Sequence, residues 1–456
     1  MAPLPFRRTA ALSCAAVLAA GCATPSLGDT SAGHTPKVVR VGLLIPGSGS
    51  DVEPQTPAEE GAQLAVDLVN DAQPSVPVPL AAGLGIPGLD GARVELVVDR
   101  RADAMSTAQV ERLVTDRAVD VLVGAGGTED VLATSQRAEQ LGVPYIGGGS
   151  TSSFLTERGL EWFFHTAPSD EALGQAFAGL LERRPDRYAN DRVAVLYPED
   201  QKGAAVAHDL RDALATRGYE SALAPVPPPR RDEAGSGAAA LSRAMATGDV
   251  SGVVLVGRDP ASAQAAARAA TSAIATTGAA PAAVLGIGAG FAGVAAAATR
   301  DDQGEEAAWG DQVARGDQAD LRDSLPGLLA ATPWSAESAE HGATSSSVAE
   351  LYRGRFGRAM GAEAAEAFTA TYTAIRGVEQ ARSVDPEQVR AALAALDIPG
   401  RELVMQWDGV RFDARHRNVA ARGTFEQLTA DGPHLVEPED LARTPVRWGT
   451  DAERDS

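Results

Sequence analysis

Cysteine is nearly absent from this sequence. Of 456 residues only Cys14 and Cys22 are cysteines, and both lie close to the N-terminus. The rest of the chain can therefore form neither a disulfide bond nor a cysteine-ligated metal site. A chain of this length can bury a core large enough to fold without disulfides.

Long hydrophobic segments are also missing. Thr9–Ala20 is apolar or small throughout, but it is shorter than the roughly 20 residues that a membrane-spanning helix needs. The longest later stretch without charge, residues 269–299, is mainly alanine and glycine and is interrupted by Pro281. We therefore expect no permanent membrane span in the body of the protein.

The sequence lacks the common catalytic motifs. Its six histidines have no H-x-x-x-H spacing, and neither a P-loop nor a G-x-S-x-G sequence occurs. Residues 288–293 match G-x-G-x-x-G, but no second strand with an acidic end follows at the required distance. Nucleotide binding and enzymatic activity are kept only as weak alternatives, and we expect no catalytic residue, no metal and no cofactor.

Basic residues are outnumbered by acidic ones. The chain has 61 Asp and Glu against 40 Lys and Arg, which gives a formal net charge of −21 at pH 7. Such a surface repels nucleic acids and anionic membranes. We therefore expect neither as a partner.

The N-terminal residues indicate export. Two arginines precede the short apolar run, a combination typical of signal peptides. The run ends in Leu-Ala-Ala-Gly-Cys at residues 18–22, which resembles the bacterial lipobox. This resemblance implies cleavage before Cys22 and lipid attachment to its thiol. Residues 1–21 are then the signal peptide and residues 22–36 a flexible tether; the alternative is an ordinary signal peptide with a chance cysteine.

Strands and helices alternate in the rest of the chain. Apolar runs predict strands, and stretches with a 3.6-residue period predict helices. The expected strands are 38–45, 94–99, 121–123, 143–146, 193–196, 252–256, 284–287 and 404–412, and the expected helices include 58–70, 129–141, 204–217, 261–277 and further ones between 345 and 396. This order predicts the α/β class, with two doubly wound parallel sheets covered by helices on both faces.

Five parts of the sequence carry a family resemblance. They are Val41–Pro46 with Gly61–Ala65, Val121–Gly126, Val143–Thr156, Phe164–Asp170 with Gln175, and Trp407–Val419. In this order and spacing the chain resembles the type I periplasmic binding proteins that serve branched-chain amino acid (Leu/Ile/Val) ABC transporters. The resemblance implies two lobes joined by a hinge, with a solute bound between them.

The same resemblance implies how the chain divides. Residues 38–166 with 335–398 would form the N-terminal lobe, residues 167–331 with 400–448 the C-terminal lobe, and residues 299–326 a polar surface insertion. Each lobe is thus assembled from separate stretches of chain.

Two turns of the first lobe are expected to hold the solute. In open α/β sheets, ligands bind beyond the carboxyl ends of the strands, at helix N-termini with free N–H groups. Thr128 belongs to the first such turn, and Gly149, Ser150 and Thr151 form the second. In the relatives, positions that match Thr128, Gly149 and Thr151 hold the amino-acid head group. The alternative is that the hydroxyl groups only cap helices.

The second lobe departs from the family pattern. Amino-acid-binding relatives have an aromatic residue in place of Lys202, a tyrosine near Arg258, and near Gly288 a glutamate that neutralises the ligand's ammonium group. We therefore hypothesise a ligand with more negative charge or without an ammonium group, such as a small carboxylate; the alternative is that both cations are simply solvated at the rim of the cleft. Trp334, where the chain should cross between lobes again, either covers an apolar part of the ligand or packs in the hinge.

The resemblance implies a function outside the cytoplasm. We expect a monomeric substrate-binding protein of an ABC importer, lipid-anchored on the outer face of the cell membrane, that binds a small amino-acid-like or carboxylate ligand and delivers it to a membrane permease. The alternative is a lipoprotein of the same fold that senses a ligand or regulates cell-wall synthesis without transport.

Overall fold

The computed structural model describes most of the chain after residue 37. The described ranges are 38–46, 55–100, 105–184, 191–226, 235–246, 249–292, 325, 327–340, 342–429 and 431–449, all within one unit, Pro36–Ser456. The predicted signal peptide, the lipidation residue Cys22, the tether and nearly all of the 299–326 insertion lie outside these ranges, so they stay predictions.

The first sheet has five parallel strands in the order β2-β1-β3-β4-β5. Their bounds are Val38–Leu44 for β1, Arg93–Val98 for β2, Val121–Gly124 for β3, Tyr145–Gly147 for β4 and Phe163–His165 for β5. Strands β3, β4 and β5 are buried along their whole length. Sheets buried on both faces have such continuous apolar strands, so the expectation of helices on either side is met.

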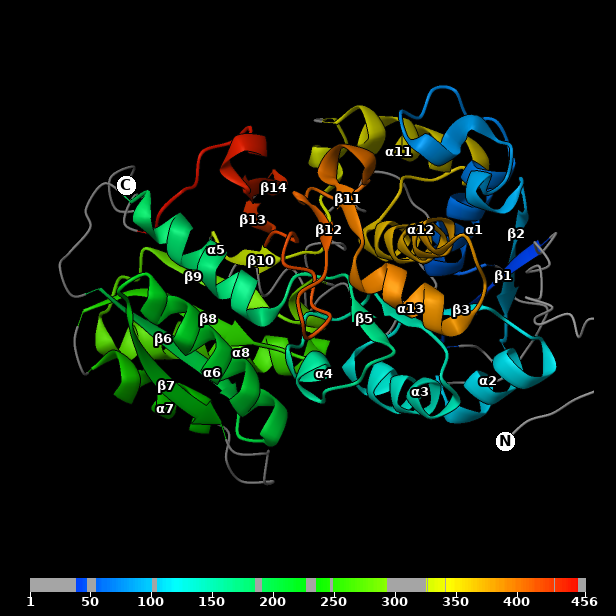
Figure 1. Cartoon of the computed structure of the whole chain (residues 1–456). Coiled ribbons are helices and arrows are strands. Elements are labelled where there is room, and N and C mark those ends of the chain that lie inside the picture. Colours follow the sequence, from blue (N-terminus) through cyan, green and yellow to red (C-terminus); the bar gives the residue numbers. More distant parts are fainter. Residues whose placement is uncertain are drawn as a thin grey trace, which may run out of the picture. The chain divides into compact units, whose positions relative to one another are not determined.

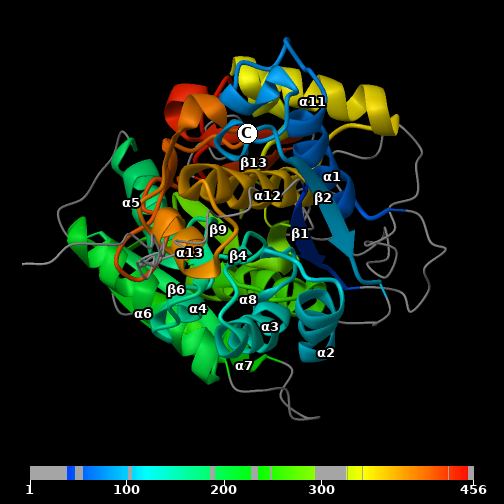
Figure 2. The ribbon, with the colours of Figure 1, turned by 45° about the vertical axis from the view of Figure 1, so that its right-hand side comes forward.

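Helices cover both faces of this sheet. One face carries α1 (Pro57–Asn70) and α12 (Ala362–Ala381), which share one hydrophobic core with β1 although they are far apart in the sequence. The other face carries α2 (Thr107–Glu111) and α3 (Thr128–Leu141), which pack in a second core. Figures 1 and 2 both show α1 beside α12, with α2 and α3 on the opposite side of the sheet.

The second sheet has seven strands in the order β14-β13-β10-β9-β8-β6-β7. The bounds are Arg192–Pro198 for β6, Glu220–Val226 for β7, Val250–Val256 for β8, Ala283–Ile287 for β9, Leu329–Ala331 for β10, Phe425–Thr429 for β13 and Gly432–Glu437 for β14. Strands β6 to β10 pair in parallel, whereas β13 and β14 add antiparallel pairs at one edge. The predicted α/β class with parallel sheets is therefore confirmed, and the antiparallel edge is an addition to it.

The second sheet is also covered on both faces. Helices α5 (Asp170–Glu182) and α6 (Gln201–Thr216) contribute to one core, and α7 (Ser236–Met245) and α8 (Pro260–Thr277) to the other. Shorter or peripheral elements are α4 (Phe154–Glu157), α11 (Ala343–Phe356), α13 (Pro386–Ala394), β11 (Asp397–Pro399), β12 (Gly409–Arg411), the π-turn η3 (Arg112–Asp116) and the 3₁₀ turns η1 (Pro79–Ala82), η2 (Pro87–Leu89), η4 (Ala336–Glu340), η5 (Gly400–Glu402) and η6 (Glu439–Leu441).

The segment before β13 packs with the first sheet. Leu403, Trp407 and Phe412 belong to the same hydrophobic core as α1 and α12, and only β13 and β14 join the second sheet. The expected division assigned all of residues 400–448 to the second lobe; the lobe boundaries stay a prediction. The expected strand over 404–412 is limited to β12.

The chain passes between the two sheets three times. The first passage lies between β5 and α5, the second between β10 and η4, and the last between β12 and β13. These passages are hydrogen-bonded to one another. The amide of Thr332 donates to the carbonyl of Thr424 at 3.0 Å. The side-chain amide of Asn418 donates to the carbonyl of Thr166 at 3.0 Å. Within the described ranges, no helix is long and apolar enough to cross a membrane.

Candidate functional site

Most of the predicted ligand-binding residues follow the carboxyl ends of strands. In the first sheet Thr128 comes after β3 and Gly149–Thr151 after β4. In the second sheet Lys202 comes after β6, Arg258 after β8 and Gly288 after β9. Open α/β sheets bind their ligands at this edge.

The two predicted turns of the first sheet touch each other. The hydroxyl oxygens of Thr128 and Ser150 are 2.8 Å apart, within hydrogen-bond distance. Thr128 begins α3, whose N-cap is Gly127, a residue without a side chain that could cap the helix. The alternative that Thr128 only caps its helix is therefore not what the structure shows. A Cβ at Gly149 would lie 2.9 Å from the carbonyl oxygen of Gly126, so this close approach favours glycine.

Buried polar groups fix the turn that follows β4. The ring Nε2 of His165 forms a hydrogen bond with the carbonyl of Ser150, and burial lowers the pKa of His165 to about 4, so its ring is neutral. The hydroxyl of Thr151 donates to Oδ1 of Asp170 at 2.9 Å, and the amide of Asp170 donates back to the carbonyl of Thr151 at 3.0 Å. These contacts hold the predicted head-group turn against the start of α5.

Both predicted cations of the second sheet have a carboxylate partner. Lys202 forms an ion pair with Glu129, in the first turn of α3, and this pair joins the strand-end edges of the two sheets. Arg258 Nη2 lies 2.6 Å from Oδ2 of Asp200. Burial and then the nearby charge of Arg258 lower the pKa of Lys202. The structure thus brings the two cations together, while the hypothesis that they bind an anion stays a prediction.

Sequence reasoning missed the two carboxylates. Asp200 is the N-cap of α6 and accepts a hydrogen bond from the amide of Gly203 at 2.9 Å. An aspartate immediately before a predicted helix is a typical N-cap, so Asp200 could have been recognised from the sequence. Glu129 could be recognised as a first-turn acidic residue, but its partner lies in another sheet and could not be predicted from spacing.

Gly288 and Trp334 occupy tightly packed positions. Gly288 has φ +96°, and a Cβ there would lie 2.5 Å from the carbonyl oxygen of Gly257, so no other residue fits without a shift of the backbone. Trp334 is 5% exposed and belongs to the core of the first sheet. This burial matches the hinge-packing alternative, and ligand contact by Trp334 stays a prediction.

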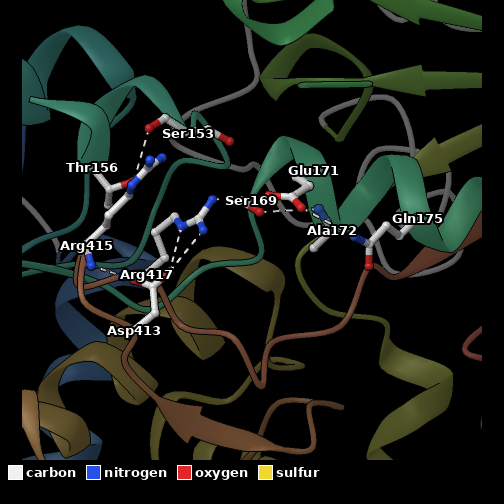
Figure 3. A network of polar contacts seen from close by, with 9 residues as sticks. All are labelled: Ser153, Thr156, Ser169, Glu171, Ala172, Gln175, Asp413, Arg415 and Arg417. Atoms are coloured by element: carbon white, nitrogen blue, oxygen red, sulfur yellow. Dashed lines mark hydrogen bonds and ion pairs between the residues drawn. The ribbon is translucent and has the colours of Figure 1, made fainter. Parts of the chain in front are cut away.

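A charged network ties the last passage of the chain to α5 (Figure 3). Arg417 donates to the carboxylate of Asp413 at 3.0 Å and to that of Glu171 at 3.1 Å. Gln175 donates to the other oxygen of Glu171 at 3.4 Å. The start of α5 is therefore bonded both to the Thr151 turn and to the segment before β13.

Other places offer less for a ligand. A hollow of about 590 Å³ contains Glu161, Arg390, Arg415 and His416 but none of the predicted binding residues. Arg390 already pairs with Glu161 at 2.9 Å, so we assign no ligand to this hollow. In the part of the chain that the structure describes, no cluster of three or more His, Cys, Asp or Glu could hold a metal ion.

Curated relatives of this chain are named as amino-acid-binding proteins. Leu/Ile/Val-binding protein homolog 8 of Brucella abortus is 29% identical over 194 residues, which is 41% of this chain and 44% of that protein. Homolog 7 of Brucella suis is 27% identical over 222 residues, 47% of this chain and 49% of that protein. The chain thus matches about half the length of these relatives, or less.

Solved structures share the fold over most of the chain. An ABC transporter substrate-binding protein from Desulfitobacterium hafniense, solved with Leu, has a TM-score of 0.60 at 16% identity and covers 88% of this chain and 99% of its own. The binding protein LivJ from Streptococcus pneumoniae, solved with isoleucine, has a TM-score of 0.55 at 19% identity and covers 88% and 100%. A solute-binding protein from Rhodopseudomonas palustris, solved with 3,4-dihydroxy benzoic acid, has a TM-score of 0.55 at 15% identity and covers 88% and 95%.

These likenesses confirm the predicted type I periplasmic binding protein fold. The family model described as periplasmic binding protein matches residues 38–432, which is most of the sequence. The chain therefore belongs to the periplasmic binding protein family.

Proposed function

We propose that this protein is the extracytoplasmic substrate-binding protein of an ABC importer. It binds a small amino-acid-like or carboxylate solute between two lobes, each built around one of the two sheets. Thr128, Gly149, Ser150 and Thr151 bind the head group, and the turns after β6, β8 and β9 complete the site from the second sheet.

One observation carries this proposal. The start of α3, whose N-cap is a glycine, and the turn after β4 meet through the hydroxyl groups of Thr128 and Ser150. A helix N-terminus with adjacent hydroxyl groups favours the carboxylate end of a small molecule. The ion pair between Glu129 and Lys202 then supports a second wall, because it brings the strand ends of the other sheet to the same place.

The cellular setting follows from the family and the N-terminal sequence. Periplasmic binding proteins act outside the cytoplasm, and the relatives named above support amino-acid-like solutes. The Leu-Ala-Ala-Gly-Cys sequence supports a lipid anchor at Cys22. We propose that the monomer delivers its solute to a membrane permease by closing its lobes about the three passages of the chain.

Calorimetric titration and thermal unfolding of the purified protein test the proposal. The probes are L-leucine, L-isoleucine, L-valine and 3,4-dihydroxybenzoate. The first three appear in the names of the curated relatives, and the fourth is the ligand in one of the similar solved structures. A probe at a hundred times its Kd should raise the free energy of unfolding by about 2.7 kcal/mol. Thr128→Val should weaken that binding by about tenfold, because a hydroxyl that bonds a charged head group is lost.

Thr276→Val is the matched control. Thr276 lies on the exposed side of α8 and its hydroxyl bonds only the carbonyl of Ser272, so its loss should leave binding unchanged. The proposal fails if none of the four probes stabilises the parent protein, or if the two valine variants bind alike.

A further inference from the structure

The second sheet has no room for a carboxylate at Gly288. The backbone there is in the left-handed region, and a Cβ would collide with the carbonyl of Gly257. Amino-acid-binding relatives are expected to place a glutamate close to this position. If the solute has an ammonium group, its counter-charge must come from another residue.

The carboxylates next to the predicted cations are already engaged. Glu129 pairs with Lys202, and Asp200 pairs with Arg258 and caps α6. Each of these acids neutralises a neighbouring basic residue. They leave no net negative charge for a ligand's ammonium group.

Glu366 is a different kind of carboxylate at the same edge. A Cβ at Gly148 would lie 3.2 Å from the carbonyl oxygen of Glu366 and 3.1 Å from the Cβ of Ala370. Glu366 precedes Ala370 by one helical turn on α12, so both side chains leave the same face of the helix. Because Cα–Cβ bonds tilt toward the N-terminus of a helix, we expect the side chain of Glu366 to be directed from this face of α12 toward the strand-end side of Gly148.

The two sides of the candidate site are thus close together. Gly149 touches Gly126, so the turn beside Glu366 is in contact with the turn that leads to Thr128. Helix α3 begins on one side of the strand ends, and the first turns of α12 lie on the other. The end of β4 therefore lies between these two helix starts.

Glu366 has no partner of its own. Among the described residues it forms neither a hydrogen bond nor an ion pair, although it is half-buried. Burial, and then the charge of Glu363, raise its pKa well above that of an exposed carboxyl group. A half-buried acid without a partner is costly unless a cation is supplied, and a bound ligand can supply one.

We propose that Glu366 binds the ammonium group of the solute while the start of α3 and the Ser150 turn bind its carboxylate. This inference rests on the proposed function and makes the ligand an α-amino acid rather than a simple carboxylate. Glu366 is then the residue that determines specificity for the amine.

Matched ligand pairs test the inference by calorimetry on the full-length protein. Each pair is a branched-chain amino acid and the acid that lacks only its amine: L-leucine with 4-methylpentanoate, L-isoleucine with 3-methylpentanoate, and L-valine with 3-methylbutanoate. The parent should bind the amino acid of a pair about tenfold more tightly or better. Glu366→Gln should remove that preference and leave the affinity for the deaminated acid within about twofold.

Two further measurements separate binding from folding. Glu363→Gln removes the same charge one turn earlier on α12 and should retain the preference for the amino acid. Thermal unfolding of Glu366→Gln without ligand should occur at the same temperature as the parent or higher, because a half-buried charge without a partner is lost.

The outcomes distinguish this inference from the proposed function. Equal affinity of the parent for both members of a pair would overturn the role of Glu366 and leave a carboxylate-binding protein. The same holds if Glu366→Gln weakens both members equally, which would mean that Glu366 only holds the turn in place. Absence of binding by all six probes would contradict the role of Glu366, and if 3,4-dihydroxybenzoate also fails to bind, the proposed function is contradicted as well.

Discussion

Asp170 is a buried carboxyl group at the start of α5, where it bonds the predicted head-group turn. Burial, helped by the nearby charge of Asp209, raises its pKa to about 7, although the hydroxyl of Thr151 acts in the opposite direction. The sequence identifies Asp170 as a first-turn residue of a helix, where acidic residues are common. It does not show the burial, because that depends on the turn of the other sheet packed against it.

The pH dependence of stability should report this residue. The pKa of Asp170 in the folded protein is above the reference value of 3.8, so the folded state keeps the proton after the unfolded chain has lost it. As the pH rises from about 4 to about 7, Asp170 therefore lowers the free energy of unfolding, by on the order of 1–4 kcal/mol. Urea unfolding measures this effect. Between pH 5 and pH 8, the free energy of unfolding should decline less in Asp170→Asn than in the parent.

An exposed acid provides the comparison for this measurement. Asp116→Asn replaces an exposed acid in the same way. Its free energy of unfolding should decline between pH 5 and pH 8 as much as that of the parent. Some decline should persist in Asp170→Asn, because burial also raises the pKa of Glu426 to about 7. An identical decline in the parent and in Asp170→Asn would contradict the assignment.

The candidate binding residues show what sequence can reveal at this scale. The positions of Thr128 and Ser150 after strands could be predicted, since strand ends and helix starts are local features. Their mutual hydrogen bond and the partner of Lys202 could not, because they depend on how separate turns meet. The sequence shows Glu366 only as one acidic residue in an alanine-rich helix, and this position does not indicate a function.

Helices α1 and α12 approach each other closely at one glycine. A Cβ at Gly61 would lie 2.0 Å from the carbonyl oxygen of Ala364. The backbones can therefore come together only because residue 61 has no side chain and residue 364 a small one. This contact sets the position of α12 relative to the first sheet and hence the place of Glu366.

A single added methyl group should disturb this helix pair. Gly61→Ala should lower the free energy of unfolding by about 1–3 kcal/mol, because the helices must separate or shift. Gly354→Ala is the control: Gly354 lies on α11 with nothing within 4 Å of the added Cβ, so alanine should stabilise by about 0.5–1 kcal/mol. Chemical denaturation measures both, and equal stabilities of the two variants would contradict the packing argument.

Elements with apolar runs or strong helical periodicity were predictable from the sequence, and several strands of the second sheet were not. Strands β6, β8 and β9 and helices α6 and α8 form where apolar runs and helical periods predict them. Strand β7 was missed because it is an edge strand with mostly half-exposed residues. Strand β13 was missed because it contains the buried polar residues Glu426 and Gln427, which interrupt an apolar pattern. Strand β14 was missed because its first three residues, Gly-Pro-His, are half-exposed and form no apolar run.

At the scale of the whole molecule, the passages between the sheets depend on Asn418. Its side-chain amide donates to the carbonyls of Thr166 and Gly409 at 3.0 and 3.1 Å. Its side-chain oxygen accepts from the amides of Arg411 and Ala420, both at 3.0 Å. One buried side chain thus joins the first passage of the chain to the last.

Removal of this side chain should be costly. Asn418→Ala leaves buried carbonyls and amides without partners and should lower the free energy of unfolding by about 2–4 kcal/mol. Its neighbour Val419 is 52% exposed, so Val419→Ala should change the free energy of unfolding by less than about 0.5 kcal/mol. Thermal or urea unfolding compares the two, and a small effect of Asn418→Ala would show that the passages do not need this residue.

The sequence predicted two sheets but not where the last passage begins. Val410 and Phe412 pack in the core of the first sheet, where their burial depends on α12 and not on any local signal. We propose that the boundary between the lobes lies after Ala421, which still belongs to that core. The strands that follow it complete the second sheet.

Both halves of the protein need residues from the last quarter of the sequence. The first sheet is covered by α12, and the second ends with β13 and β14. A nascent chain, which emerges from its N-terminus, cannot complete either half until these late segments have been synthesised. The order of elements therefore delays the completion of folding until late in translation. That delay suits the export proposed for this protein, because a translocated chain passes its secretion channel before it acquires its final form.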